Sequence, residues 1–296
     1  MKRKLTGLLL NLRTRQAVNI YLNKPRQALL LVGPHGSGKL SLAEAIAAEL
    51  LNLGSPDDLA KYPYFSHLQR KDRQQDISIE ALRGVIRTGS LKIPGAQPVR
   101  RLILIENAQD LSLPAQNALL KTLEEPPAGT VFILTAQSVN SVLPTLASRT
   151  VAIEVCPVGL DDSLQFFSKD YKTPAIEQAW HLSQASVGLM SALLADDTAH
   201  PLKQAVEAAK DLLPRPAYER LKLIDGLTAD RQQLDNLLDG LERLLAAMHH
   251  SAVYKSNQPI SRKILAQRRR VSRLRGQLAQ NANPRLIGLS LALNLH

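Results

Sequence analysis

The sequence predicts an α/β domain built on a parallel sheet, followed by a helical region. Two observations predict it. Short apolar runs alternate with helical stretches in the first half of the 296-residue chain, and no convincing strand occurs after Pro157. Strands that alternate with helices indicate a parallel sheet with helices on both faces. We therefore expect an α/β domain over residues 1–156 and two helical domains over residues 157–200 and 201–296.

The elements of the first domain follow from their local patterns. Helices are expected where aliphatic residues recur at helical spacing, at residues 8–24, 42–53, 79–90 and 113–123. Strands are expected where short runs of apolar residues occur, which is typical of strands buried on both faces, at residues 28–32, 101–105, 130–134 and 151–155. Two helices have clear stop signals, because Gly54-Ser55-Pro56 and Pro126-Pro127 follow them directly.

Composition excludes several classes of protein. A hydrophobic content of 45% supports a sizeable core, so a disordered chain is not expected. The single cysteine, Cys156, excludes an internal disulfide and a multi-cysteine zinc site, and it fits a reducing, cytoplasmic compartment. The chain lacks an apolar run long enough to span a membrane. Its first twelve residues briefly resemble a secretory signal, but no small-residue cleavage site follows them.

The charge is unevenly distributed along the chain. The net charge of +11 points to a polyanionic partner. Residues 1–156 carry a net charge of +7, residues 157–204 carry −3, and residues 205–296 carry +7. The segment from Lys255 to Arg285 holds nine basic residues and no acidic one. This sign pattern supports a division into three parts.

A phosphate-binding loop is the sharpest local motif. The segment Gly33-Pro34-His35-Gly36-Ser37-Gly38-Lys39 follows an expected strand and precedes an expected helix. It matches the G-x-x-x-x-G-K core of a P-loop, whose backbone amides cradle phosphates while the lysine reaches the outer phosphates. We expect a nucleotide to contact five residues of this loop: Gly33, Gly36, Ser37, Gly38 and Lys39.

Two positions argue against nucleotide hydrolysis. The complete motif places a Ser or Thr hydroxyl on Mg²⁺ directly after the lysine, whereas this chain has Leu40 there. Ser41 comes one residue later and is therefore turned about 100° around the helix. The strand at 101–105 ends in Glu106-Asn107, where an ATPase has an Asp for the metal and often a Glu to activate water. We expect a loop that can bind ATP or ADP without hydrolysis, and no metal site.

Further segments resemble the AAA+ subunits of bacterial clamp loaders. Residues 115–127, Ala-Gln-Asn-Ala-Leu-Leu-Lys-Thr-Leu-Glu-Glu-Pro-Pro, resemble the family's NALLKTLEEPP signature. Residues 143–150 resemble the segment that ends in the family's Ser-Arg-Cys motif, with Thr150 in place of the cysteine, and residues 281–286 resemble its C-terminal collar helix. The resemblance covers nearly the whole chain. It implies an α/β P-loop (AAA+) module over residues 1–156, a small helical lid over 157–200 and an all-α collar domain over 201–296.

Within that family, the resemblance implies a stator rather than a motor. Such a subunit joins a hetero-pentamer with gamma/tau and delta subunits, which opens the β sliding clamp and loads it onto primer-template DNA. Arg149, preceded by Ser148, then occupies the position of the arginine finger, which acts in trans on a neighbour's ATP. Residues 50–100 lack the four zinc-binding cysteines of many relatives, so no zinc is expected. Residues 188–193 lack the second-sensor arginine of the motor subunits.

The sequence leaves two other functions open. An ATP-hydrolysing motor subunit of the gamma/tau type would have to use Glu106 unconventionally, and a stand-alone basic DNA-binding protein would explain the charge. Glu124-Glu125 is better explained as a helix end before Pro126-Pro127 than as a catalytic carboxylate pair. Candidate DNA contacts are the basic side chains of two helical segments, Arg83, Arg87, Arg268, Arg269 and Arg270. Whether the basic 255–285 segment binds DNA or packs within the collar is left open.

Overall fold

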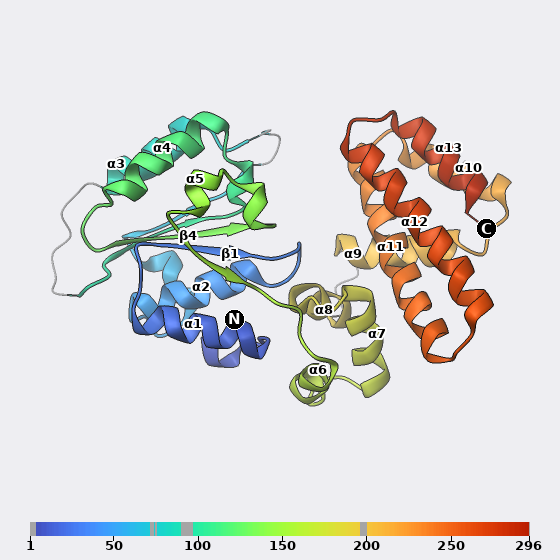
Figure 1. Ribbon diagram of the computed structural model, residues 1–296, viewed down its shortest axis with the longest axis horizontal. Helices are drawn as coiled ribbons and strands as arrows, with labels where there is room; N and C mark the ends of the chain where they lie inside the picture. The colour runs from blue at the N-terminus through green and yellow to red at the C-terminus, as the bar shows by residue number, and fades with distance from the viewer. Residues whose placement is uncertain (1–3, 72–73, 75, 90–96, 196–199, 296) are drawn as a thin grey trace. The chain divides into compact units, whose positions relative to one another are not determined.

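A computed structural model describes residues 4–71, 74, 76–89, 97–195 and 200–295 of the chain (Figure 1). The chain forms two compact units, Met1–Val158 and Gly159–His296. The first unit ends two residues after the boundary expected from the sequence. The helices on both sides of residue 200 belong to one unit, which contains both the expected lid and the expected collar.

A five-stranded parallel sheet forms the centre of the first unit. Its strands lie in the order β2-β3-β4-β1-β5. They are β1 (Ala28–Val32), β2 (Phe65–Leu68), β3 (Arg101–Ile105), β4 (Thr130–Ala136) and β5 (Val151–Glu154). Four of these strands lie where apolar runs predict them. Strand β2 was not predicted, because this four-residue edge strand is mostly half-buried and includes the polar Ser66 and His67.

Helices cover both faces of the sheet, which confirms the predicted fold class. Figure 1 shows α1 and α2 on one face and α3, α4 and α5 on the other. Their bounds are α1 (Leu12–Asn23), α2 (Lys39–Leu50), α3 (Ile79–Gly89), α4 (Leu113–Glu124) and α5 (Pro144–Ala147). Short 3₁₀ turns accompany them: η1 (Leu5–Gly7), η2 (Pro56–Lys61), η3 (Ala108–Asp110) and η4 (Val139–Ser141).

The expected helix boundaries shift where capping residues act. The first helix starts at Leu12 instead of residue 8, because the Asn11 side chain accepts a hydrogen bond from the Arg13 amide and caps it. The second helix starts at Lys39, directly after Gly38 in a left-handed conformation. Position 90, the expected end of the third helix, lies outside the described residues.

Successive strand residues supply two separate cores. Leu29 and Leu31 of β1 belong to the core cluster under α1 and α2, whereas Leu30 belongs to the cluster under α4 and α5. All three side chains are fully buried. Because neighbouring strand side chains point to opposite faces, a strand with helices on both sides needs an uninterrupted apolar run. This is why the short apolar runs located the strands correctly.

The second unit is helical throughout its described residues. Its helices are α6 (Leu160–Phe167), α7 (Thr173–Ser183), α8 (Val187–Leu194), α9 (Pro201–Leu212), α10 (Ala217–Leu227), α11 (Arg231–Tyr254), α12 (Gln258–Ala279) and α13 (Pro284–Asn294). The long helix α11 packs against α9 on one side and α12 on another. Gly240 lies where α11 meets α9, and a Cβ atom there would stand 2.3 Å from the carbonyl oxygen of Ala205. The two helix backbones are therefore in close contact at this point.

Candidate functional site

The P-loop connects β1 to α2 and depends on three glycines. Gly36 and Gly38 have φ angles of 75° and 90°, in the left-handed region that glycine adopts without strain. At Gly33, a Cβ atom would stand 3.0 Å from the Ser37 hydroxyl and 3.1 Å from the carbonyl oxygen of Val155. The loop thereby delivers the chain to the N-terminus of α2, where backbone amides and the helix dipole favour an anion.

Lys39 is bent back onto its own loop. Its ammonium group donates hydrogen bonds of 2.7 Å to the carbonyl oxygens of both Gly33 and Pro34. Burial lowers the pKa of Lys39 to about 8, and the negative charge of Glu106 only partly opposes this shift. Among the described residues, the buried Ser37 hydroxyl has no hydrogen-bond partner. A phosphate at this loop would supply a partner to Ser37 and an alternative partner to Lys39.

The lowered pKa of Lys39 predicts a pH-dependent stability. The unfolded lysine has a pKa of 10.5 and the folded one about 8. Between these values the unfolded chain holds a proton that the folded chain has released, so the free energy of unfolding rises with pH. We expect the free energy of unfolding of wild type to rise by about 2–3 kcal/mol relative to that of Lys39→Met across this range.

Urea unfolding at several pH values measures this difference between wild type and variant. The exposed Lys24 provides the control variant Lys24→Met, for which the difference should stay flat. A difference between wild type and Lys39→Met that stays constant with pH would contradict the prediction.

The residues at the positions where an ATPase holds Mg²⁺ are different in this chain. Leu40 packs against the core under α1 and α2, whereas Ser41 is exposed to solvent. Glu106 contacts His67, with 3.2 Å between Oε2 and Nε2. Asn107 has a φ of 52°, and its backbone N–H donates to the Thr135 hydroxyl at 2.9 Å. The two residues after β3 are thus held by neighbouring strands, and of the two positions after Lys39 the first carries no hydroxyl and the second is exposed.

Arg149 lies on the surface just after α5. Its Nη2 donates to Oε1 of Glu124 at 2.6 Å, and its Nη1 donates to the carbonyl oxygen of Thr145 at 3.2 Å. The Arg149 and Glu124 side chains are 37% and 50% exposed. An exposed ion pair of this kind contributes at most about 1 kcal/mol. Arg149 is therefore accessible and held in place by a contact that is easily exchanged.

Two residues, Glu124 and Gln116, make contacts that could not be predicted from the sequence. Glu124 is the partner of Arg149, although the sequence presents it only as a helix end. The buried Gln116 donates from Nε2 to the carbonyl oxygen of Leu111 at 3.1 Å, and its Oε1 accepts from the Leu143 amide at the same distance. It thereby ties the segment after β3 to the segment before α5. A lone amide on an apolar helix face is the only signal that could have pointed to it.

The candidate DNA contacts occupy different surroundings. Arg83 and Arg87 are both exposed on α3, one turn apart. Arg268 is half-buried on α12, Arg269 is exposed, and Arg270 donates a hydrogen bond to the carbonyl oxygen of Asn294. Consecutive residues on a helix are separated by about 100°. The three adjacent arginines therefore do not form one surface.

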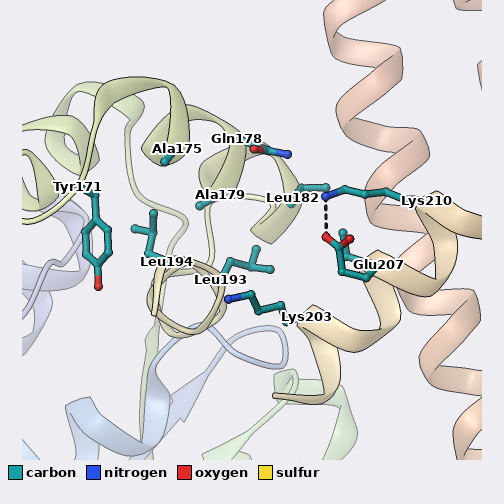
Figure 2. A pocket seen from close by; sticks show the side chains of 11 residues that line it. Tyr171, Ala175, Gln178, Ala179, Leu182, Leu193, Leu194, Lys203, Glu207 and Lys210 are labelled. Carbon is teal, nitrogen blue, oxygen red and sulfur yellow. Dashed lines mark hydrogen bonds and ion pairs between the residues drawn. The ribbon is translucent and has the colours of Figure 1, made fainter. Parts of the chain in front are cut away.

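The second unit contains a pocket of about 210 Å³ between α7, α8 and α9 (Figure 2). Leu182, Leu193 and Leu194 contribute to its lining. Lys210 forms an ion pair with Glu207 at 2.7 Å. Lys203 donates to the carbonyl oxygen of Ala195 at 3.0 Å. The charged groups of the pocket thus have partners within the chain, and its lining lacks the glycine-rich backbone that holds phosphates.

Metal-binding clusters and membrane-spanning helices do not occur among the described residues. In that part of the chain, no group of three or more His, Cys, Asp or Glu side chains is arranged to hold a metal ion. None of the described helices is both long and apolar enough to cross a bilayer.

Comparison with known proteins groups the first unit with replication proteins. The family described as "DNA polymerase III, delta subunit" matches residues 14–158, which include the P-loop and Arg149. Over 203 residues the chain is 30% identical to the DNA polymerase III subunit delta′ of Pseudomonas aeruginosa, covering 63% of this chain and 61% of that protein. Over these parts of its sequence the chain is similar to delta and delta′ subunits of DNA polymerase III.

Two further matches extend this similarity. The delta′ subunit of Haemophilus influenzae is 29% identical over 133 residues, covering 41% of this chain and 40% of that protein. A gamma subunit-related protein of Thermotoga maritima matches with a TM-score of 0.54 over 95% of this chain and 97% of that structure, at 15% identity. The first match is a second delta′ subunit, and the second supports the fold over nearly the whole chain. The chain matches less than two thirds of the length of both delta′ relatives.

Proposed function

We propose that the chain is the non-hydrolysing, stator-like subunit of a bacterial sliding-clamp loader. In this proposal it joins gamma/tau and delta subunits in a hetero-pentamer and donates Arg149 to the ATP site of a neighbouring subunit. Its own P-loop binds ATP or ADP without hydrolysing it, and no zinc or other cofactor is required. The assembly then opens the β clamp and places it on primer-template DNA.

The observation that carries the proposal is a contrast within one α/β unit. The P-loop keeps its glycines and Lys39, but Leu40 packs into the core where hydrolysis requires a hydroxyl for Mg²⁺. Arg149, in contrast, stands exposed with a guanidinium that can form bidentate contacts with phosphate. A subunit with this pair of features can complete a neighbour's site without turning over nucleotide itself.

Measurements of ATP turnover test the assignment. We expect the isolated chain to show no turnover above background, and Lys39→Ala to leave turnover by the reconstituted loader within about twofold of wild type. The physical reason is that the P-loop of this subunit takes no part in phosphoryl transfer. The equivalent lysine change in a gamma/tau subunit serves as the control and should reduce turnover sharply. Turnover by the isolated chain at the rate of a motor subunit, abolished by Lys39→Ala, would favour the gamma/tau-like alternative.

A further inference from the structure

Helix α12 has an apolar face and an opposite basic face. Its buried residues belong to the core of the second unit, and they are Ile264, Val271, Leu274 and Leu278. The residues on the opposite side recur at helical spacing and are all exposed: Arg262, Ala266, Arg269, Arg273, Gly276 and Gln280. We call this set the α12 arginine stripe. From Arg262 to Arg273 it extends along about 16 Å of helix.

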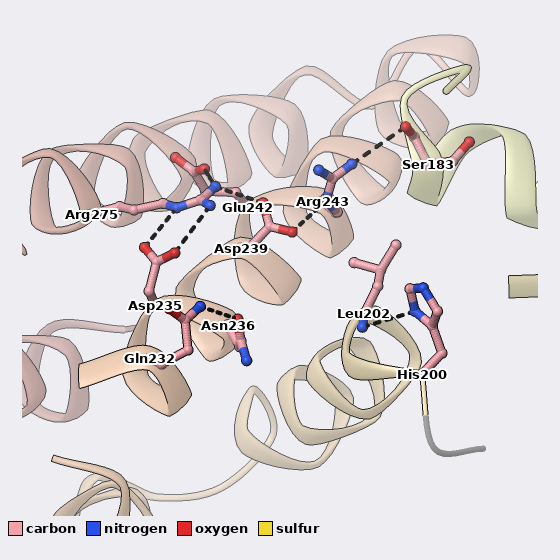
Figure 3. A network of polar contacts seen from close by, with 10 residues as sticks. All are labelled: Ser183, His200, Leu202, Gln232, Asp235, Asn236, Asp239, Glu242, Arg243 and Arg275. Atoms are coloured by element: carbon pink, nitrogen blue, oxygen red, sulfur yellow. Dashed lines mark hydrogen bonds and ion pairs between the residues drawn. The ribbon is translucent and has the colours of Figure 1, made fainter. Parts of the chain in front are cut away.

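The acidic groups nearest to α12 on α11 are neutralised by a different arginine. Figure 3 shows Arg275 directed at α11, where its guanidinium donates to three carboxylates at 2.6–3.1 Å, those of Asp235, Asp239 and Glu242. Arg243 donates to Asp239 at 2.7 Å and to the carbonyl oxygen of Ser183. Burial opposes ionisation of Asp239, but these two arginines outweigh it and lower its pKa. The carboxylates of this network are thus already occupied by Arg275 and Arg243.

The arginines of the stripe have no such partners. Within the described residues, Arg262, Arg269 and Arg273 form no ion pair or hydrogen bond through their side chains. The sequence from Lys255 to Arg285 holds nine basic residues and no acidic one, so neither α12 nor its flanking turns supply a counter-charge. The same helix therefore uses Arg275 for packing and keeps three uncompensated guanidinium groups on one exposed face.

We propose that the α12 arginine stripe binds the phosphate backbone of duplex DNA. Duplex DNA presents one phosphate charge per about 3.4 Å along each strand, so a stripe of this length spans several phosphates. Two small residues between and beside the arginines, Ala266 and Gly276, leave room for a backbone to approach. At Gly276 no atom lies within 4 Å of the position of a Cβ. Binding of this kind depends on the phosphate charges and not on the base sequence of the DNA.

Other polyanionic surfaces fit the stripe less well. Single strands are usually held by aromatic side chains that stack on bases, and α12 contains no aromatic residue. A membrane surface would require the apolar face of the helix, which is buried against the rest of the unit. An acidic protein surface normally surrounds an apolar centre, whereas the stripe consists only of Arg, Gln, Gly and one Ala and presents no large apolar side chain.

The inference rests on the proposed function only in taking DNA as the polymer that a clamp loader meets. Its test uses the full chain without ATP or other subunits, so its failure would leave the role of Arg149 unaffected. Binding of a fluorescent duplex of about 20 base pairs is measured by anisotropy from about 20 to 200 mM salt. Three proteins are compared: wild type, the triple variant Arg262→Gln/Arg269→Gln/Arg273→Gln, and a control of equal charge change, Lys169→Gln/Lys172→Gln/Lys222→Gln. The control lysines are all exposed in the same unit.

We expect the triple variant to bind the duplex at least about tenfold more weakly at low salt, with the slope of log affinity against log salt reduced by about 2.7. The control should change affinity by less than about twofold, and circular dichroism should show that all three proteins are folded. Equal losses in both variants would show a response to net charge alone and overturn the proposal. So would tighter binding of oligo(dT) than of duplex, or a triple variant that binds the duplex as tightly as wild type does.

Discussion

Replacing Arg149 by alanine should reduce ATP turnover at the neighbouring site by about 10³-fold in the reconstituted loader, with the complex still assembled. An arginine supplied in trans stabilises the charge that develops on the transferred phosphoryl group, and its loss typically costs a factor of about 10³–10⁵. Folding should be unaffected, because the side-chain ion pair that Arg149 forms within the described residues is an exposed contact with Glu124. Turnover is measured together with clamp loading on primed DNA.

Two further variants separate chemistry from packing in this experiment. Arg149→Lys keeps the charge but lacks the planar fork of donors, so it should remain strongly impaired. Glu124→Gln removes the resting partner of Arg149 and should leave turnover at or above the wild-type level, since the guanidinium is then freer to move to the neighbour. Unchanged turnover with Arg149→Ala in an intact complex would contradict the arginine-finger role.

Replacing Gly240 by alanine should destabilise the second unit by about 3 kcal/mol. The added Cβ would lie 2.3 Å from the carbonyl oxygen and 2.5 Å from the carbonyl carbon of Ala205 on α9. Overpacking usually costs about 1–3 kcal/mol, and the upper end applies here because backbone atoms of α9 cannot rotate away. Unfolding of the helical unit in urea, followed by circular dichroism, measures the change.

Gly226 on α10 supplies the matched control. No atom lies within 4 Å of a Cβ built there, and alanine is the better helix former. Gly226→Ala should therefore leave the unit equally stable or stabilise it by up to about 1 kcal/mol. If Gly240→Ala unfolded at the same urea concentration as this control, the close contact between α11 and α9 would be refuted.

The parts of the fold that could be predicted are those set by local burial. Apolar runs located the central strands β1, β3 and β4 because both faces of a central parallel strand are covered, and the shorter run Val-Ala-Ile located the edge strand β5. The other edge strand, β2, lacks such a run, since its residues Phe-Ser-His-Leu include two polar side chains and are mostly half-buried or exposed. The packing of helices across residue 200 was not predictable either, because it depends on which helix faces meet rather than on composition.

The candidate site likewise has features that depend on local sequence and contacts between residues far apart in the chain. The glycines of the P-loop, Leu40 and the position of Arg149 could be identified from short motifs, because each depends on residues adjacent in sequence. The contact between Arg149 and Glu124 joins residues 25 positions apart, and no local pattern encodes it. The run Arg268-Arg269-Arg270 suggested a single basic cluster, but the helical turn separates its members and groups Arg269 with Arg262 and Arg273 instead.

The bent-back position of Lys39 affects how the P-loop responds to changes in the cellular nucleotide supply. The two hydrogen bonds from Lys39 to carbonyl groups of its own loop brace the loop from within, and a phosphate must compete with them. We expect the shape of this loop to be largely independent of the cellular ratio of ATP to ADP. Such a subunit would act as a fixed reference frame against which its neighbours move as their energy supply fluctuates.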